Sequence, residues 1–471
     1  MADIETAESL VICQSGLGVA LRATLLKLSR FQAVFEIYSP PGVLRMSESL
    51  NEFKILIQGR LLYSGRAVIT NLIHMGSIVV CEAALDETCL DMSAAASVGD
   101  PAALQASFEQ FLKECSRTFR INSEFKVVMA DMQTFFLDLR LWMEQMELTV
   151  RSQPAGDRLQ RELDLLHSLE HPVLPAVAPV LEKFEVLSNQ IEPDQQATHR
   201  AYMKRQIHPL VMCSPFLYRT FQKPLGYAGD YEMVNMMLRD PFEGGSMFAK
   251  LVNRIFLDTP PVVAHQSRIE YLTRHLTDEV RRAAARGRPL RVFNVGCGPA
   301  KEIQNFLSEQ DLSSRAQFTL LDFNEETLAF ATQALGEVKS RHNRGTSIQM
   351  LKRSVYQMLK DSGKPVGGAK YDLVYCAGLF DYLSDQVCKR LTNLMYDMVA
   401  PGGLLITTNV SSANPSRNWM EYVLDWHLLY RSAAQFAALV PEGAPLDSFS
   451  VQAIGAGVNI ALEVRKPDNA S

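Results

Sequence analysis

The chain has 471 residues, of which 47% are hydrophobic and 21% charged, and its formal net charge is -5. This is the composition of an ordinary globular protein, and the length predicts about two to four domains. So mild an acidity gives no basic face for nucleic acid, and eight cysteines without Cys-x-x-Cys spacing indicate no metal site. Because no apolar run is long enough to span a membrane and residues 1–5 lack a signal-peptide pattern, we expect a cytoplasmic protein without an integral membrane segment.

Residues 1–95 are predicted to form a small antiparallel barrel or sandwich. Short alternating strands are separated by Pro40-Pro41, Gly59 and Gly76, a spacing typical of small β domains. The expected strands cover residues 32–38, 53–58, 66–69 and 77–82.

This β domain resembles a PilZ domain, the module that binds cyclic di-GMP in other proteins. Asn71, Ile73 and Gly76 fall at the Asp-x-Ser-x-x-Gly spacing of that family, but an aliphatic residue replaces the serine and no Arg-x-x-x-Arg pair precedes it. A pocket without paired guanidinium groups loses most of its attraction for a dianionic dinucleotide. We therefore expect a degenerate barrel used for packing or partner binding, with ligand sensing as the alternative and cyclic di-GMP binding not expected.

Residues 96–207 are predicted to form a helical bundle that links two domains. Apolar residues recur at three- and four-residue steps over residues 125–150 and 156–188, and the second helix is expected to break near His171-Pro172.

The third predicted domain, residues 208–471, begins with the segment Lys223-Pro-Leu-Gly-Tyr-Ala-Gly-Asp-Tyr-Glu232. Two glycines and a proline among aromatic and acidic residues are entropically costly to order, which indicates that the segment docks against something. It is either a lid over a ligand pocket or a surface turn in which Asp230 caps a helix over residues 231–238.

Residues 290–300 predict a strand that enters a Gly-rich turn and then a helix beginning at Lys301. Gly296 and Gly298 allow the backbone to approach a ligand, and the helix would direct its free N–H groups at it. About 20 residues beyond the turn, a second strand ends at Asp322, which can accept hydrogen bonds from both hydroxyls of a ribose.

Strands and helices alternate beyond this point, which predicts an α/β fold with a doubly wound, Rossmann-like parallel sheet. Lys301 stands where a dinucleotide site needs a small residue, and this argues against a dinucleotide. After the strand that enters the Gly-rich turn, the second to fifth strands are expected at residues 317–321, 347–351, 371–377 and 404–408. A closing hairpin is expected at 449–454 and 458–465.

The Gly-Cys-Gly-Pro-Ala loop, the Ala-Pro-Gly-Gly turn at residues 400–403 and the closing hairpin together resemble the class I S-adenosylmethionine-dependent methyltransferases, over about residues 220–466. The resemblance implies S-adenosylmethionine as the cofactor. Asn294 departs from the acidic residue usual at its position, so Asp230 or Glu232 would meet the ammonium end of the cofactor. The residues expected at the cofactor are Tyr227, Asp230, Asn294, Gly296, Cys297, Gly298, Pro299, Asp322, Phe323, Ser354, Val355, Ala377 and Gly378.

The segment after the fifth strand is expected to contain a helix with an aromatic face beside the methyl acceptor. The alternative is ordinary core packing for the aromatic residues and a helix-end salt bridge for Arg431. The residues expected at the acceptor are Tyr231, Asn409, Trp419, Tyr422, Trp426, Tyr430 and Arg431.

In-line transfer of a sulfonium methyl group requires mainly that donor and acceptor be held close and dry. A carboxylate acceptor needs no base, whereas a hydroxyl or amine would need one. The candidates for that catalytic role are Asp381, Tyr382 and His427, and a packed, hydrogen-bonded histidine is the alternative for His427.

The order of barrel, helices, Gly-Tyr-Ala-Gly-Asp-Tyr-Glu and Trp426-x-x-x-Tyr-Arg431 resembles bacterial methyltransferases that make 3-hydroxy fatty acid methyl esters, which are cell-density signals. This implies carboxyl O-methylation of a hydroxylated fatty acid or a related small acid. Two alternatives stay open: a protein or peptide methyltransferase, and a cofactor-sensing scaffold without turnover. A homodimer is one expected assembly.

Overall fold

The structure is a computed structural model that describes most of the chain. It covers residues 9–86 apart from 17, 30, 39–43, 58 and 76–77, a few positions between 101 and 112, and residues 121–361 and 370–468. The chain divides into two compact units: the first holds residues 1–228, 240–258 and 416–427, and the second holds residues 229–239, 259–415 and 428–471. The three domains expected from the sequence stay a prediction.

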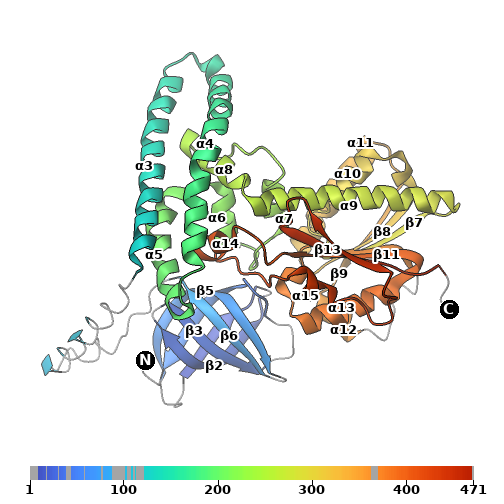
Figure 1. The fold of residues 1–471 in the computed structure, drawn as a ribbon, viewed down its shortest axis with the longest axis horizontal. Helices are drawn as coiled ribbons and strands as arrows, with labels where there is room; N and C mark the ends of the chain where they lie inside the picture. The colour runs from blue at the N-terminus through green and yellow to red at the C-terminus, as the bar shows by residue number, and fades with distance from the viewer. Residues whose placement is uncertain are drawn as a thin grey trace. The chain divides into compact units, whose positions relative to one another are not determined.

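The N-terminal strands close into a barrel, which confirms the barrel alternative over the sandwich (Figure 1). The strand order is β1-β2-β3-β6-β5-β4, and every pair is antiparallel. Buried and more exposed residues alternate along the strands, as expected when one face lines a core. Gly76, the last position of the PilZ-like spacing, lies outside the described residues. The strands are β1 Ser9–Gln14, β2 Ala20–Ser29, β3 Gln32–Tyr38, β4 Ser49–Ile57, β5 Arg60–Met75 and β6 Ile78–Leu85.

The first unit also contains the long helices expected after the barrel. The predicted break near His171-Pro172 was wrong, because α4 is continuous over Arg158–Ser188 and includes three prolines. A proline removes one backbone hydrogen bond and bends a helix, but the buried Val173, Val177 and Phe184 keep one face of this helix packed. The remaining helices of this unit are α3 Ser123–Arg151, the 3-10 turn η1 Ala155–Asp157, α5 Pro193–Val211, α6 Pro215–Gln222, α8 Met247–Leu257 and α14 Arg417–Val423.

The second unit is built on a seven-stranded sheet of order β12-β13-β11-β10-β7-β8-β9. The strands from β11 to β9 are parallel, and β13 runs antiparallel between β11 and β12. This confirms the α/β fold, the Rossmann-like sheet and the hairpin at its edge. The strands are β7 Leu290–Val295, β8 Ala316–Asp322, β9 Ser347–Lys352, β10 Tyr371–Cys376, β11 Val399–Val410, β12 Phe449–Ile454 and β13 Asn459–Arg465.

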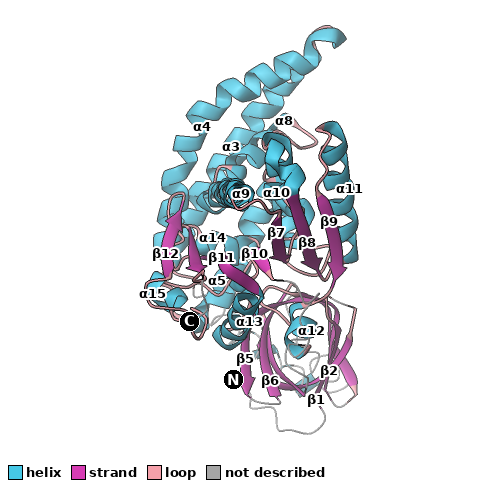
Figure 2. Cartoon of the chain, turned by 90° about the vertical axis from the view of Figure 1, so that its right-hand side faces the viewer, coloured by secondary structure: helices cyan, strands magenta, loops and turns pink. Residues whose placement is uncertain are grey.

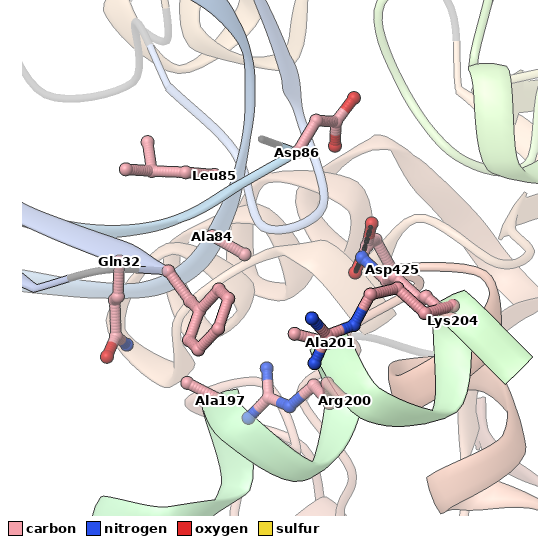
Figure 3. Close-up of a pocket in the computed structure, with 11 residues that line it drawn as sticks. Gln32, Ala84, Leu85, Asp86, Ala197, Arg200, Ala201, Lys204 and Asp425 are labelled. Atoms are coloured by element: carbon pink, nitrogen blue, oxygen red, sulfur yellow. Dashed lines mark hydrogen bonds and ion pairs between the residues drawn. The ribbon is translucent and has the colours of Figure 1, made fainter. Parts of the chain in front are cut away.

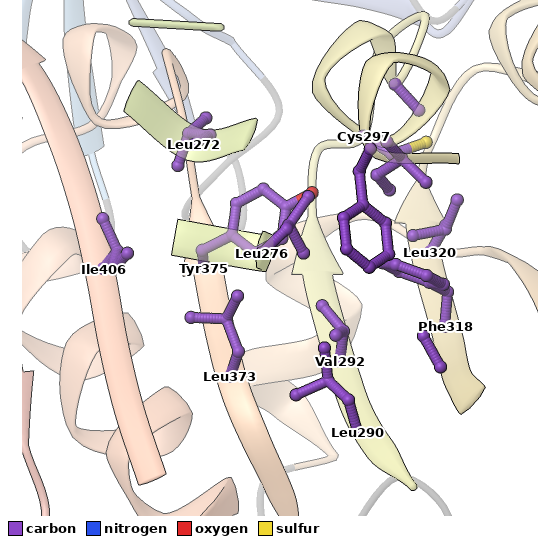
Figure 4. Packing of buried hydrophobic residues seen from close by; sticks show 14 of the residues in the cluster. Leu272, Leu276, Leu290, Val292, Cys297, Phe318, Leu320, Leu373, Tyr375 and Ile406 are labelled. Carbon is purple, nitrogen blue, oxygen red and sulfur yellow. The ribbon is translucent and has the colours of Figure 1, made fainter. Parts of the chain in front are cut away.

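Helices cover both faces of this sheet (Figure 2). Neighbouring residues of β7 show why: Val292 faces a core formed with α9, α10 and α11, whereas Phe293 faces a core formed with α12, α13 and α15. On the first face, Leu276 packs close to Tyr375 and Val292 (Figure 4). The helices are α7 Tyr231–Met236, α9 Pro260–Ala285, α10 Lys301–Glu309, α11 Glu325–Arg341, α12 Val355–Lys360, α13 Asp385–Met398 and α15 Ala433–Ala437, with 3-10 turns η2 Asp311–Arg315 and η3 Phe380–Tyr382.

Two boundaries near the end of the chain differ from expectation. Strand β11 begins at Val399 rather than Leu404, so it includes the Ala-Pro-Gly-Gly turn. The helix expected to carry Trp419 through Arg431 ends at Val423, and an irregular segment follows in which Asp425 has φ of 48°. A left-handed residue cannot continue a right-handed helix. No helix in the described parts of the chain combines the length and apolarity that crossing a membrane would require.

Replacing Leu276 by alanine should lower the free energy of unfolding by about 2–5 kcal/mol, because its fully buried side chain would leave a cavity under the sheet. Val263 lies on the same helix and is 40% exposed, so Val263→Ala is the matched control and should change stability by less than about 1 kcal/mol. Urea unfolding of the two variants measures both values. Equal effects would contradict the assignment of Leu276 to the core.

Candidate functional site

The turn between β7 and α10 has the backbone conformation that its glycines predict. Gly296, Gly298 and Ala300 have φ values of 72°, 52° and 52°, in the left-handed region that disfavours a Cβ. A Cβ placed on Gly298 would meet nothing within 4 Å, so the space above this turn is open. Ala300 precedes α10 without a side-chain cap, which leaves the start of that helix suited to a ligand. Cys297 and Pro299 complete the turn.

Asp322 joins the ends of two neighbouring strands. Its carboxylate accepts hydrogen bonds from the Gly298 N–H at 3.2 Å and from the Asn324 N–H at 3.0 Å. The residue is 6% exposed. The two backbone bonds fix the orientation of the carboxylate, and a carboxylate is an acceptor for hydroxyl donors.

Asn294, Tyr375 and Glu302 form a buried polar row behind the turn. The Tyr375 hydroxyl donates to Glu302 Oε1 at 2.6 Å, and the Asn294 side chain lies near the same hydroxyl. Burial raises the pKa of the Glu302 carboxyl. Asn294 Oδ1 is buried and has no hydrogen-bond partner among the described residues. It can therefore accept a hydrogen bond from a ligand.

A buried guanidinium faces the loop after β10. Arg268 of α9 is 8% exposed, and its Nη2 lies 2.8 Å from Nδ1 of His265. Its guanidinium packs against Gly378, where a Cβ would come within 3.0 Å of Nη2. Within the described residues Arg268 has no ion-pair partner closer than 4.0 Å, although Asp381 and Glu302 attract it from farther away. A charge buried without a partner is costly, which indicates a place for an anionic group.

Asp381 and Arg431 tie together the loops after β10 and β11. Asp381 Oδ1 accepts the Val410 N–H at 2.6 Å, and burial raises the pKa of this carboxyl. Arg431 donates to Asp385, to Asn409 Oδ1 and to the carbonyl oxygens of two loop residues, at 2.6 to 2.9 Å. These contacts are those of the salt-bridge alternative for Arg431. The roles of Asp381, Asn409 and Arg431 toward a substrate stay predictions.

Several predicted cofactor residues lie at the same carboxyl edge of the sheet. Phe323 follows β8, and Ala377 and Gly378 follow β10. Ser354 precedes α12 as its N-cap, its hydroxyl accepting the Gln357 N–H at 3.2 Å, and Val355 begins that helix. Tyr382 ends the 3-10 turn after β10, and Tyr430 directly precedes Arg431. The sheet therefore brings residues that are far apart in sequence to the carboxyl ends of its parallel strands, as a doubly wound fold does.

The segment Lys223–Glu232, expected as a lid or a surface turn, lies partly in each of the two units. Asp230 is buried and caps α7 by accepting the Met233 N–H at 2.9 Å, as the capping alternative expects. Tyr231 donates its hydroxyl to Glu326 at 2.7 Å, and its ring lies 4.8 Å from that of Phe330. Tyr227 belongs to the first unit, where Gly226 contacts Gly16 of the barrel so closely that a Cβ on Gly226 would lie 2.4 Å from the Gly16 Cα.

The aromatic residues expected at the acceptor pack within the first unit. Trp419 stacks on Phe256 with centroids 4.6 Å apart, and the Tyr422 ring lies 5.8 Å from that of Phe184. Trp426 is 9% exposed. These are the contacts of the core-packing alternative, and an acceptor-binding role stays a prediction.

His427 is also a buried residue of the first unit. Its backbone N–H donates to Ser47 Oγ, and Ser47 Oγ donates to the His427 carbonyl at 2.9 Å. Burial holds the pKa of its imidazole well below the usual value, so the ring is neutral. A neutral buried histidine fits the packed alternative, and its role as a base stays a prediction.

Sequence reasoning missed Arg268, His265, Glu302 and Tyr375. A signal for Arg268 was present, because it lies four residues after Ala264 and four before Leu272, both on the buried face of α9. An arginine at such a position needs a buried partner. Glu302 and Tyr375 gave no comparable signal, because their pairing depends on how β10 aligns with β7.

No family model matches the chain, and no curated protein matches it. Similar solved structures include a possible exported protein from Bordetella parapertussis, with 17% identity and a TM-score of 0.40 over 63% of this chain and 97% of that one. Magnesium protoporphyrin IX methyltransferase from Synechocystis PCC 6803, with bound SAH, has 15% identity and a TM-score of 0.32 over 44% and 84%. The N-methyltransferase NodS from Bradyrhizobium japonicum WM9, also with SAH, has 14% identity and a TM-score of 0.30 over 53% and 99%. These similarities are distant, so functional inference rests on the residues of this chain.

Replacing Glu302 by glutamine should remove a pH-dependent part of the stability. Because the pKa of Glu302 is raised on folding, its contribution is full below its ordinary pKa of 4.5 and is lost as the pH rises through the folded value. The stability of the natural protein relative to Glu302→Gln should therefore fall as the pH rises above 4.5. Urea unfolding at several pH values tests this, and a constant difference would show that Glu302 titrates as it does in the unfolded chain.

Proposed function

We propose that the chain is an S-adenosylmethionine-dependent methyltransferase that acts on a small-molecule acid. The observation that carries the proposal is the Asp322 carboxylate, which is held at the end of β8 by the N–H of Gly298 in the open turn after β7. This pairs a ribose-binding acid with a turn that can approach the cofactor, at the switch point of a doubly wound sheet. The closing hairpin at the sheet edge agrees with the same class of enzyme.

The residues at this edge fit the cofactor. The Asp322 carboxylate, held beside the turn after β7, suits the ribose hydroxyls, and the unfilled Asn294 Oδ1 suits an ammonium group. Arg268, which lacks a carboxylate partner among the described residues, suits the carboxylate of the methionine part. Together they explain how an asparagine can replace the usual acid at position 294: its neutral amide accepts from the ammonium group, while the nearby guanidinium balances the carboxylate.

When bound, the cofactor would supply an electrophilic methyl group. The protein would hold donor and acceptor in line and exclude water, and this positioning is the main source of rate in such a transfer. A carboxylate acceptor is ionised at neutral pH, so its methylation needs no general base. Neither Asp381, whose pKa is raised, nor His427, which is neutral, has to take a proton from it.

The acceptor that we propose is a hydroxylated fatty acid or a related acid used in bacterial signalling, on the strength of the sequence resemblance. The experiment is incubation of the protein with radiolabelled S-adenosylmethionine and acids extracted from the producing cells, followed by mass spectrometry. Labelled methyl esters support the proposal. Label found only in protein would point to a protein methyltransferase, and cofactor binding without turnover of any acceptor would point to a sensing scaffold.

Replacing Asp322 by alanine should weaken the affinity for S-adenosylhomocysteine by about 1–3 kcal/mol, because buried hydroxyl donors would lose their acceptor. Asp311→Ala is the control, since the Asp311 side chain is 96% exposed and pairs with Arg344. Calorimetry measures both affinities. An unchanged affinity for the Asp322 variant would mean that the ribose is not held at this carboxylate.

Replacing Arg268 by methionine should lower the affinity for S-adenosylhomocysteine by about 1.5–3 kcal/mol, the usual value of a hydrogen bond to a charged group. The affinity for 5′-methylthioadenosine, which has no carboxylate, should not change. Arg274→Met on the exposed side of the same helix is the matched variant. Equal losses for both ligands would show that Arg268 supports the fold of the site rather than the carboxylate.

A further inference from the structure

A pocket in the first unit lies between the barrel and helix α5 (Figure 3). Its volume is about 100 Å³. About 10–15 Å³ of such volume holds one water molecule, so the pocket can hold several waters or a small oxyanion group. One wall is apolar, with Phe31, Ala84 and Leu85 from the barrel and Ala197 and Ala201 from the helix.

The opposite character comes from three cations of α5, of which Arg205 is exposed. Arg200, Lys204 and Arg205 all line the pocket, and their spacing of four and five residues places them on adjacent turns of the helix. The chain as a whole is acidic, with a net charge of -5, so this concentration of positive charge is local. It lies next to apolar surface, which lowers the local dielectric and strengthens attraction for an anion.

The two acidic residues of the pocket are already paired. Asp425 is fully buried, and Lys204 Nζ donates to its two oxygens at 2.6 and 2.5 Å. Asp86 pairs with Arg66 at 2.9 Å. The acids therefore leave two of the three cations of the helix without a carboxylate.

Those two cations are Arg200 and Arg205. Arg200 Nη2 donates to Gln196 at 3.1 Å, but its Nε is buried and has no hydrogen-bond partner among the described residues. Within the same part of the chain, Arg205 has no ion pair and no hydrogen bond of its side chain. A buried N–H without an acceptor is destabilising, and an oxyanion entering the pocket would supply one.

We propose that this pocket binds a small molecule through a carboxylate or phosphate group, held by Arg200 and Arg205, with its carbon part against Phe31 and Leu85. Guanidinium groups bind both oxyanions with paired hydrogen bonds. This site goes beyond the proposed methyl transfer and gives the barrel a ligand whose chemistry is set by α5. It does not use the PilZ-like positions at Asn71 and Ile73.

The proposal is tested by calorimetry on the full-length protein at fixed ionic strength, with inorganic phosphate, acetate and octanoate as the probes. Saturable binding of at least one probe is expected. Preference for phosphate would identify a phosphate ester as the ligand source, and octanoate binding more tightly than acetate would identify an acid with an apolar chain. No saturable binding of any probe would overturn the proposal.

The variant Arg200→Gln/Arg205→Gln should weaken binding of the preferred probe at least about tenfold, which is the effect of losing one to two charge-assisted hydrogen bonds. The matched control is Arg158→Gln/Arg161→Gln on α4, which removes the same charge from exposed side chains. Circular dichroism confirms that both variants fold. Equal weakening by both pairs would show attraction by net charge alone and would overturn the site.

Discussion

The hydrogen bond from the Gly298 N–H to the Asp322 carboxylate is the interaction on which the proposed cofactor site of the second unit depends. It connects the turn after β7 with the end of β8, so two segments that meet only because their strands are neighbours become one surface. The left-handed glycines make the close approach sterically possible, and the carboxylate holds the turn in that shape. A ligand that uses both would find them already positioned, which reduces the entropy lost on binding.

Behind this surface the unit places charged groups in its interior. Arg268, Glu302 and Asp381 are each less than a tenth exposed, and attraction between Arg268 and the two acids partly offsets the cost of burying them. None of these acids reaches Arg268 closely enough to form an ion pair in the described structure, so the compensation is incomplete. Buried ionisable groups with perturbed pKa values cluster at functional sites. The buried row of Asn294, Tyr375 and Glu302 extends the same polar interior toward the turn.

The sequence predicted the parts of the fold that depend on local pattern. The apolar strands, the Gly-rich turn, Asp230 as a helix cap and the terminal hairpin follow from periodicity and turn chemistry, and the structure agrees. It did not predict that α4 continues through its prolines, because tertiary packing on Val173, Val177 and Phe184 outweighs the local break. Nor could it predict that Glu302 meets Tyr375, since that contact depends on strand register. The aromatic stripe from Trp419 shows the opposite case: a periodic pattern gives the buried face but not its partner, which is Phe256 of a helix far away in sequence.

The path of the chain has a consequence for how this protein can be divided. The chain changes unit at residues 229, 240, 259, 416 and 428. Neither unit is therefore a continuous stretch. A cut between residues 228 and 229 would leave every segment of the second unit in the C-terminal fragment, but it would separate residues 240–258 and 416–427 from the rest of the first unit. Helix α14, for example, lies between β11 and the last strands in sequence, yet its Trp419 packs in the first unit. The first unit therefore cannot be removed or transferred as one segment of sequence, unlike a domain that occupies a single continuous stretch.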